Sequence, residues 1–243
     1  MKNFKTSSVF DTDIYSFFQA KRKNMVLWSD QSGLDGLLDR SGYGNHASKA
    51  GTLSYQKDAI GRENASFEFD GGALVNFGDN DLFSFVDSGD KPFSIFFRFF
   101  DPGSPNTVHT PIAKAVSATE GEYYILLSSG SVVFRLIDEA NGASIGMKTR
   151  NNLIEPSKWY DVLCVYDGSG LTSGLKIYVN GHESAQDESN VNSGYVSMQN
   201  TARDFLIGGR GSTQRFTGGV CDVRLFAEEL TQKDARDLGD SIW

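Results

Sequence analysis

Cysteine is scarce in this sequence, because Cys164 and Cys221 are the only two among 243 residues. Each lies in an alternating apolar stretch, where cysteine usually behaves as a small buried hydrophobic residue. A disulfide between them requires neighbouring strands, and the sequence alone does not decide that pairing. We expect two free thiols, which fits folding in a reducing cytoplasm.

Long apolar runs are also missing. No stretch approaches the ~18 apolar residues of a membrane-spanning helix, so membrane insertion is not expected. Lys2 and Lys5 resemble the charged start of a leader, but the apolar run of a secretory signal does not follow them. The standard secretory route is therefore not expected either.

Positive charge is in short supply. The chain has 23 Lys and Arg against 31 Asp and Glu, a formal net charge of −8. An acidic surface repels phosphate backbones, which argues against nucleic acid as a partner. One basic cluster, Lys21-Arg22-Lys23, fits either a solvated turn or a small patch for an anion or a partner.

Proline is limited to 5 residues, whereas glycine reaches 26 and aromatic residues make up 12 % of the chain. This composition favours tight turns around an aromatic core. Strands do not alternate with long helices, which argues against an α/β fold. The predicted fold is all-β, an antiparallel sandwich of about 12 strands. The alternating segments that predict it are 65–71, 92–100, 122–138, 158–168, 174–184, 204–209 and 215–226.

Three local patterns refine this fold. The segment 92–100 is apolar on both faces, so we place it at the centre of a sheet, where it cannot pair with another chain. Asn180-Gly181 predicts a tight hairpin. Thr231 and Asp234 have the spacing of a capping box, which predicts one short helix at 232–238.

Four motifs, in their order along the chain, carry a family resemblance. They are "LLDRSGYGNHASKAG" (37–51), "ASFEFDGG" (65–72), "WY…YDG" with "LKIYVNG" (159–181), and "IGG…FTGGVCDVRLF…LT" (207–231). The chain resembles the laminin-G-like domains of the concanavalin A-like lectin/glucanase superfamily over residues 37–240. The resemblance implies a jelly-roll sandwich, and it implies much less about function.

The residues give no support for an enzyme. Glucanases of this superfamily carry a Glu-x-Asp-x-x-Glu strand, whose alternation puts three carboxylates on one face. The segment "ENASFE" (63–68) lacks both the central Asp and the spacing. Neither cysteine adjoins a histidine, so nucleophilic catalysis has no support. We therefore expect no catalytic residue and no cofactor.

Calcium is the ion that the resemblance implies, because many laminin-G-like domains hold it with loop oxygens. Asp39, Asp70 and Asp222 are the acidic residues in the matching motifs. The alternative is that Asp39 and Asp70 accept hydrogen bonds from nearby backbone N–H groups and that Asp222 is satisfied within its strand. Cation sites need six or more oxygens, so the metal ligands stay unassigned.

Sugar binding in proteins often uses exposed aromatic side chains. Tyr43, Tyr55 and Tyr195 fall in loop-like contexts and could form such a platform, although scattered surface tyrosines are the alternative. Trp159 starts a core-like strand and is expected to be buried. The remaining candidates are Trp28, Trp243 and the dispersed histidines His46, His109 and His182, none of which has metal-ligand spacing.

These observations suggest two parts, an N-terminal segment at 1–36 and a sandwich domain at 37–243. The segment is rich in aromatics, which fits an anchor or arm that contacts other proteins. The alternative is that the segment adds an edge strand or a helix to its own sandwich. We expect a non-catalytic, lectin-like recognition or structural module of a bacteriophage virion, assembled in the host cytoplasm, with host-surface glycans as its candidate ligands. The alternatives are a carbohydrate-binding module of a cell-surface or secreted protein and a glycoside hydrolase.

Overall fold

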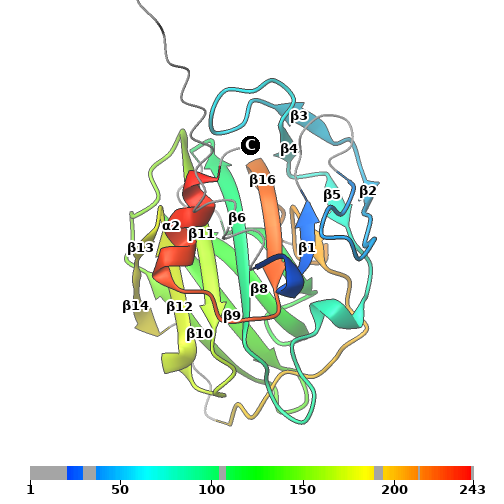
Figure 1. Ribbon diagram of the computed structural model, residues 1–243, viewed down its shortest axis with the longest axis vertical. Helices are drawn as coiled ribbons and strands as arrows, with labels where there is room; N and C mark the ends of the chain where they lie inside the picture. The colour runs from blue at the N-terminus through cyan, green and yellow to red at the C-terminus, as the bar shows by residue number, and fades with distance from the viewer. Residues whose placement is uncertain (1–20, 30–36, 104–107, 189–193, 213, 242–243) are drawn as a thin grey trace, which may run out of the picture.

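The computed structural model describes residues 21–29, 37–103, 108–188, 194–212 and 214–241 (Figure 1). Two eight-stranded antiparallel sheets form a sandwich, as predicted. Sheet A runs in the order β13 (His182–Glu183), β12 (Leu175–Val179), β11 (Lys158–Tyr166), β6 (Phe93–Asp101), β16 (Thr217–Phe226), β4 (Ser66–Asp70) and β3 (Ser54–Gln56), with β1 (Met25–Ser29) also paired to β16.

Sheet B packs behind sheet A. Its order is β14 (Ala185–Glu188), β10 (Ala143–Thr149), β9 (Ser131–Asp138), β8 (Gly121–Ser128), β7 (His109–Ala115), β15 (Leu206–Ile207), β5 (Leu74–Asn76) and β2 (Ser48–Ala50). The described chain thus has more strands than the 12 expected. Six of them are only two to four residues long, too short for alternation to be visible in the sequence.

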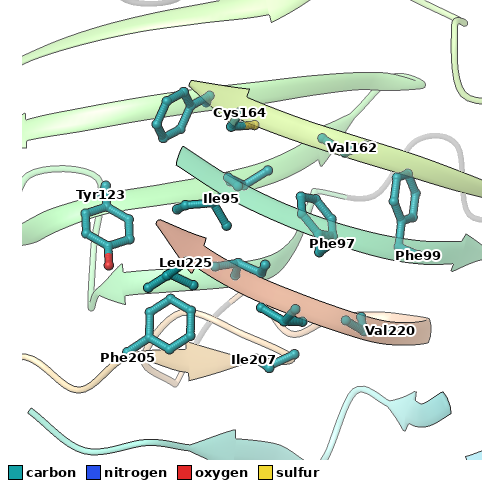
Figure 2. Packing of buried hydrophobic residues seen from close by; sticks show 14 of the residues in the cluster. Ile95, Phe97, Phe99, Tyr123, Val162, Cys164, Phe205, Ile207, Val220 and Leu225 are labelled. Atoms are coloured by element: carbon teal, nitrogen blue, oxygen red, sulfur yellow. The ribbon is translucent and has the colours of Figure 1, made fainter. Parts of the chain in front are cut away.

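The core fills the space between the sheets (Figure 2). Phe93, Ile95, Phe97 and Phe99 of β6 point into it, and β6 lies between β11 and β16, in the central position predicted. Each fully buried side chain of this size stabilises the fold by about 1.5–3 kcal/mol. Cys164 of β11 belongs to the same core, and both cysteines are free and buried, as expected.

Helix α2 (Gln232–Asp240) covers the outer face of sheet A (Figure 1). Leu238 and Ala235 of the helix pack on Phe96 and Leu163 of the sheet. The predicted capping box is present: Thr231 accepts a hydrogen bond from the Asp234 N–H, and the Asp234 side chain accepts one from the Thr231 N–H. The helix continues two residues beyond the predicted end at 238. The described helices include none long and apolar enough to cross a membrane.

Strand β1 corrects the predicted domain boundary. Met25–Ser29 was assigned to a separate arm, yet this strand pairs with β16, and Met25, Val26 and Leu27 are buried. This agrees with the alternative, an edge strand added to the sandwich. The bounds of the strand were not predicted, because three consecutive residues are buried and the alternation is hidden. Residues 1–20 and 30–36 of the predicted arm lie outside the described residues.

The basic cluster is also placed by the structure. Lys21 pairs with Glu228 at 3.0 Å and Asp234 at 3.6 Å. Arg22 and Lys23 lie in the short 3-10 helix η1 (Arg22–Asn24) and are exposed. Two further 3-10 helices are η3 (Asp81–Phe83) and η4 (Thr172–Gly174).

Candidate functional site

The outer face of sheet B carries rows of residues set by strand register. Alternation sends Tyr123 into the core and Tyr124 to the outer face. Tyr124 of β8 lies opposite Arg135 of β9 and Ala113 of β7. These residues come from three strands, so antiparallel pairing alone brings them together.

The row beside it is more apolar. Leu126 of β8 pairs with Val133 of β9, which pairs in turn with Lys148 of β10. Leu126 and Val133 are buried in the same outer-face cluster as Tyr124. This face therefore offers an apolar floor with charged side chains at its border.

Arg210 reaches this face from the loop between β15 and β16. The Gly208 N–H donates to the Pro111 carbonyl at 2.9 Å, which fixes the loop against β7. Gly211 has φ +56°, and a Cβ there would lie 2.8 Å from the Val116 carbonyl oxygen. Glycine therefore permits the close approach that lays Arg210 over sheet B.

Two guanidinium groups contact the Tyr124 ring. Arg135 Nη1 donates to Tyr124 Oη at 2.9 Å. The guanidinium carbon of Arg210 lies 4.1 Å from the ring centroid, within the range of a cation–π contact. Tyr124 thus holds both arginines in place.

A pocket of about 490 Å³ opens among these residues. Its charged lining consists of Arg135, Lys148 and Arg210, and no Asp or Glu is among the described residues that line it. Its size lies within the range of small-molecule sites, and such sites combine an apolar wall with a few fixed polar groups. The polar lining includes Ser128, Asn151 and Gln214.

Arg210 has an unusual environment. Only 5 % of the residue is exposed, and its guanidinium makes no hydrogen bond or ion pair with the described part of the chain; Nε and Nη1 are shielded from solvent. Burying a charge without a partner costs several kcal/mol, and a desolvated cation–π contact returns about 2 kcal/mol, which is only part of that cost. The pocket therefore contains a cation whose desolvation is largely uncompensated.

Asp39 stabilises a loop. Its carboxylate accepts hydrogen bonds from the N–H groups of Trp28 (3.0 Å), Ser41 (2.8 Å) and Asn45 (3.0 Å). Its own N–H donates to His46 Nδ1 at 3.0 Å. The Asp-x-Ser-Gly-x-Gly-Asn-His motif is therefore explained by hydrogen bonds from backbone N–H groups to Asp39, which was the alternative to calcium binding.

The other two calcium candidates are likewise engaged in local contacts. Asp70 accepts a hydrogen bond from the Gly72 N–H at 2.8 Å. Asp222 accepts from Arg224 Nε at 2.6 Å and from Trp28 Nε1 at 3.2 Å. Among the residues that the structure describes, no three His, Cys, Asp or Glu side chains gather as metal ligands.

Two of the three candidate tyrosines pack against the core and are not available for an exposed platform. Tyr55 packs against the core, with its ring 5.8 Å from that of Phe67. Tyr195 also packs against the core and donates to Asp90 Oδ2 at 2.6 Å. Tyr43 is half exposed. Loop positions in the sequence do not reveal that two of these rings point inward.

None of the described tryptophans and histidines lines the sheet B pocket. Trp159 is half-buried, contrary to expectation, because it lies beside Phe100 on the outer face of sheet A. His46 and His182 are exposed, as expected, and His109 is buried with Nδ1 3.2 Å from the Arg215 carbonyl. Trp28 is half-buried, and Trp243 lies outside the described residues.

The two glutamates of "ENASFE" lie away from the pocket: Glu68 belongs to β4 of sheet A, and Glu63 precedes this strand in the chain. Glu63 pairs with Lys57 at 2.9 Å, and Glu68 of β4 accepts from Ser54 Oγ at 3.1 Å. Neither lines the pocket.

The sequence analysis missed Tyr124, Arg135 and Arg210. One signal was available, since Arg135 interrupts the apolar run 131–138 on the face opposite to Phe134. Arg210 had no such signal, because its position depends on a loop folding back over β8.

Comparison with known proteins fits this architecture. A family model described as the Concanavalin A-like lectin/glucanases superfamily matches residues 69–236. The chain belongs to this superfamily. No curated protein matches the sequence.

Solved structures similar to this concanavalin A-like domain include receptor-binding domains. One, described as "Crystal structure of the receptor binding domain", has 19 % identity and a TM-score of 0.68, covering 93 % of this chain and 52 % of the matched chain. The binding domain of botulinum neurotoxin DC in complex with rat synaptotagmin II has 19 % identity and a TM-score of 0.67, covering 91 % and 52 %.

A third structure concerns botulinum neurotoxin type C, whose cell entry is described as dependent upon interaction with two ganglioside molecules. It has 19 % identity and a TM-score of 0.68, covering 92 % of this chain and 53 % of the matched chain. The chain spans about half the length of the chains it matches. The likeness therefore establishes the fold, and function must be argued from the site.

Proposed function

We propose that this domain is a non-catalytic recognition module that binds a glycan in the sheet B pocket. The observation that carries the proposal is the pocket itself, with an apolar floor beside Tyr124 and polar side chains at Ser128, Asn151 and Gln214. An apolar surface can pack against a sugar ring while hydroxyl and amide groups bond to its hydroxyls. Lectin-type superfamily membership supports the same function.

The composition of the pocket also supports binding without catalysis. The superfamily includes glucanases, and glycoside hydrolysis usually needs two carboxyl groups that flank the scissile bond. No such pair lies among the described residues that line the pocket. We therefore expect no turnover of polysaccharides, and sustained hydrolysis that one Asp or Glu substitution abolishes would overturn this part of the proposal.

A blocking substitution tests the glycan site. Ser128 is half-buried at the end of β8 and lines the pocket, so Ser128→Trp should fill part of it. We expect the whole chain to bind at least one oligosaccharide class on a glycan array, and S128W to weaken that binding at least tenfold. Thr52→Trp, at an exposed position outside the pocket, is the matched control and should bind like the parent. Equal binding by S128W, or no binding to any glycan, contradicts the proposal.

We further propose a bacteriophage particle as the setting, with virion proteins as partners. Free buried thiols agree with assembly in a host cytoplasm, and the aromatics Phe4, Phe10, Tyr15 and Phe17 support a contact segment before β1. Capsid or tail genes beside this gene, and the protein in purified particles, are the expected findings. A gene set for cell-surface proteins instead supports the alternative setting, a surface or secreted binding module.

A further inference from the structure

We propose that the sheet B pocket selects saccharides that carry an acidic group, which Arg210 seats with the help of Arg135 and Lys148. This inference rests on the proposed function, because it names the class of glycan for the same site. It adds a requirement for negative charge that sugar binding alone does not impose.

The first argument comes from the charge of the pocket. Three cationic side chains line it, without a carboxylate among the described lining residues, in a chain whose formal net charge is −8. A cluster of one sign raises the local concentration of the opposite ion and steers its approach. Outside the pocket the protein carries more negative than positive charge and repels anions. An anionic ligand is therefore directed to this pocket.

The second argument comes from comparing Arg210 with other buried cations. Arg98 lies 2.9 Å from Asp161, Lys114 lies 2.8 Å from Asp79, and Arg224 lies 2.6 Å from Asp222. Each of these cations is nearly inaccessible and has a carboxylate at contact distance. Arg210 is equally buried, yet no described carboxylate or carbonyl bonds to it.

An anionic group on the ligand would supply the negatively charged partner that no described residue gives to Arg210. A guanidinium offers planar, paired donors that match a carboxylate, and hydrogen bonds between ionised groups are stronger than those between neutral groups. The guanidinium of Arg210 lies over the Tyr124 ring, and this contact restricts its position before the ligand arrives. Preorganisation of this kind reduces the loss of side-chain freedom on binding.

The chemistry fits a carboxylate or a sulfate ester on the sugar, and the binding test separates these sources. The whole chain is titrated with an oligogalacturonide, with its methyl ester, which has the same ring and no charge, and with a sulfated oligosaccharide of similar length. We expect at least one acidic ligand to bind tenfold or more tightly than the neutral ester, and rising salt to weaken the acidic ligand more.

Variants assign the preference to Arg210. Arg210→Met should abolish the preference for the acidic ligand, and Arg210→Lys should retain only part of it. Because no described residue pairs with the charge of Arg210, R210M should leave the melting temperature unchanged or raise it, which shows that the protein remains folded. Arg215→Met is the matched control, since Arg215 lies in the same loop and does not line the pocket; it should keep the preference.

The outcomes separate the two proposals. Equal binding of acidic and neutral saccharides overturns the inference and leaves the glycan-binding function standing. An acid preference that survives in R210M overturns the role of Arg210. Binding of inorganic polyphosphate as tightly as the acidic saccharide shows an unselective anion site and also overturns the inference. No binding of any saccharide removes both proposals.

Discussion

Arg98 shows how a single buried cation joins a sheet to a helix. Its Nη2 donates to the carbonyls of Leu238 (2.7 Å) and Gly239 (2.9 Å), in the last turn of α2. Its Nε lies 2.9 Å from Asp161 Oδ1 on β11. A positive charge near a helix C-terminus is favourable, because the unpaired carbonyls there carry partial negative charge. The helix is therefore held by charge as well as by apolar packing.

Asp161 should make stability depend on pH. Burial raises its pKa to about 6 from 3.8; Arg98 opposes this rise, and the negative Asp222 adds to it. Because the folded-state pKa lies above the unfolded value, the stability from this carboxyl is full below about pH 4 and is lost as pH rises through about 6. Asp161→Asn should remove this dependence.

The measurement is chemical denaturation at pH 4 and pH 7. The difference in free energy of unfolding between the parent and D161N should decrease, to the disadvantage of the parent, as the pH rises from 4 to 7. The decrease should be about 3 kcal/mol at most. The exposed Asp87→Asn is the control and should leave the pH profile as in the parent. Parallel pH profiles for D161N and the parent contradict the assignment.

The two thiols should be unreactive in the folded protein. Burial raises the pKa of both Cys164 and Cys221, and the thiolate is the reactive form. We expect no reaction with Ellman's reagent under native conditions and two reactive thiols in denaturant. Rapid labelling of the native protein would show that one of the two strands opens readily.

At the scale of elements, β16 has two partners along one edge. Its residues 217–220 pair with β4, and residues 223–226 pair with β1. Its register against β6 shifts between Cys221 and Arg224, and Asp222 adopts φ +53° within this shift. A bulge bends a strand and increases its twist, so the two halves of the edge can meet different neighbours.

The turn after β15 depends on Gly208. This residue has φ +96°, and a Cβ there would lie 2.2 Å from Cε1 of Phe69. Gly208→Ala should destabilise the fold by roughly 2–4 kcal/mol, through strain and overpacking in the core. That corresponds to a fall of several degrees in melting temperature.

Gly89→Ala is the matched control. No heavy atom lies within 4 Å of a Cβ at that position, and its φ is not in the left-handed region. The melting temperature of G89A should stay within about a degree of the parent, because surface substitutions rarely change stability by more than 0.5 kcal/mol. Equal melting temperatures for G208A and the parent would show that Phe69 moves aside at little cost.

At the scale of the whole molecule, the two outer faces differ. Helix α2 packs on the outer face of sheet A beside β11 (Figure 1), whereas the pocket lies on the outer face of sheet B. The pocket and helix α2 thus lie on opposite faces of the sandwich. Mutations in the pocket can therefore be tested without disturbing the helix.

A pair of truncations tests the place of β1. Removing residues 1–29 deletes three buried side chains, Met25, Val26 and Leu27, each worth about 1.5–3 kcal/mol. Compared with removal of residues 1–20, it should lower the free energy of unfolding by roughly 5 kcal/mol, close to the total stability of many domains. Urea denaturation measures the difference. Equal stability of the two truncated proteins would mean that β1 adds nothing to the sandwich.

The sequence by itself determined the local structure. Alternation in 92–100 and 122–138 predicted strands, Asn180-Gly181 predicted a hairpin that has positive φ at both residues, and Thr231 with Asp234 predicted the helix. These features depend on backbone geometry over a few residues, which neighbouring side chains are sufficient to set. The order of four such motifs also indicated the superfamily.

Tertiary structure alone decided the site. Arg210 and Tyr124 are 86 residues apart, and they meet because β15 pairs with β7 and the following loop lies against β7, from which the Arg210 side chain reaches the Tyr124 ring. The inward direction of Tyr55 and the pairing of β1 with β16 likewise depend on contacts between distant segments. Local patterns carry no information on such contacts, because register between distant strands is fixed by packing of the complete core.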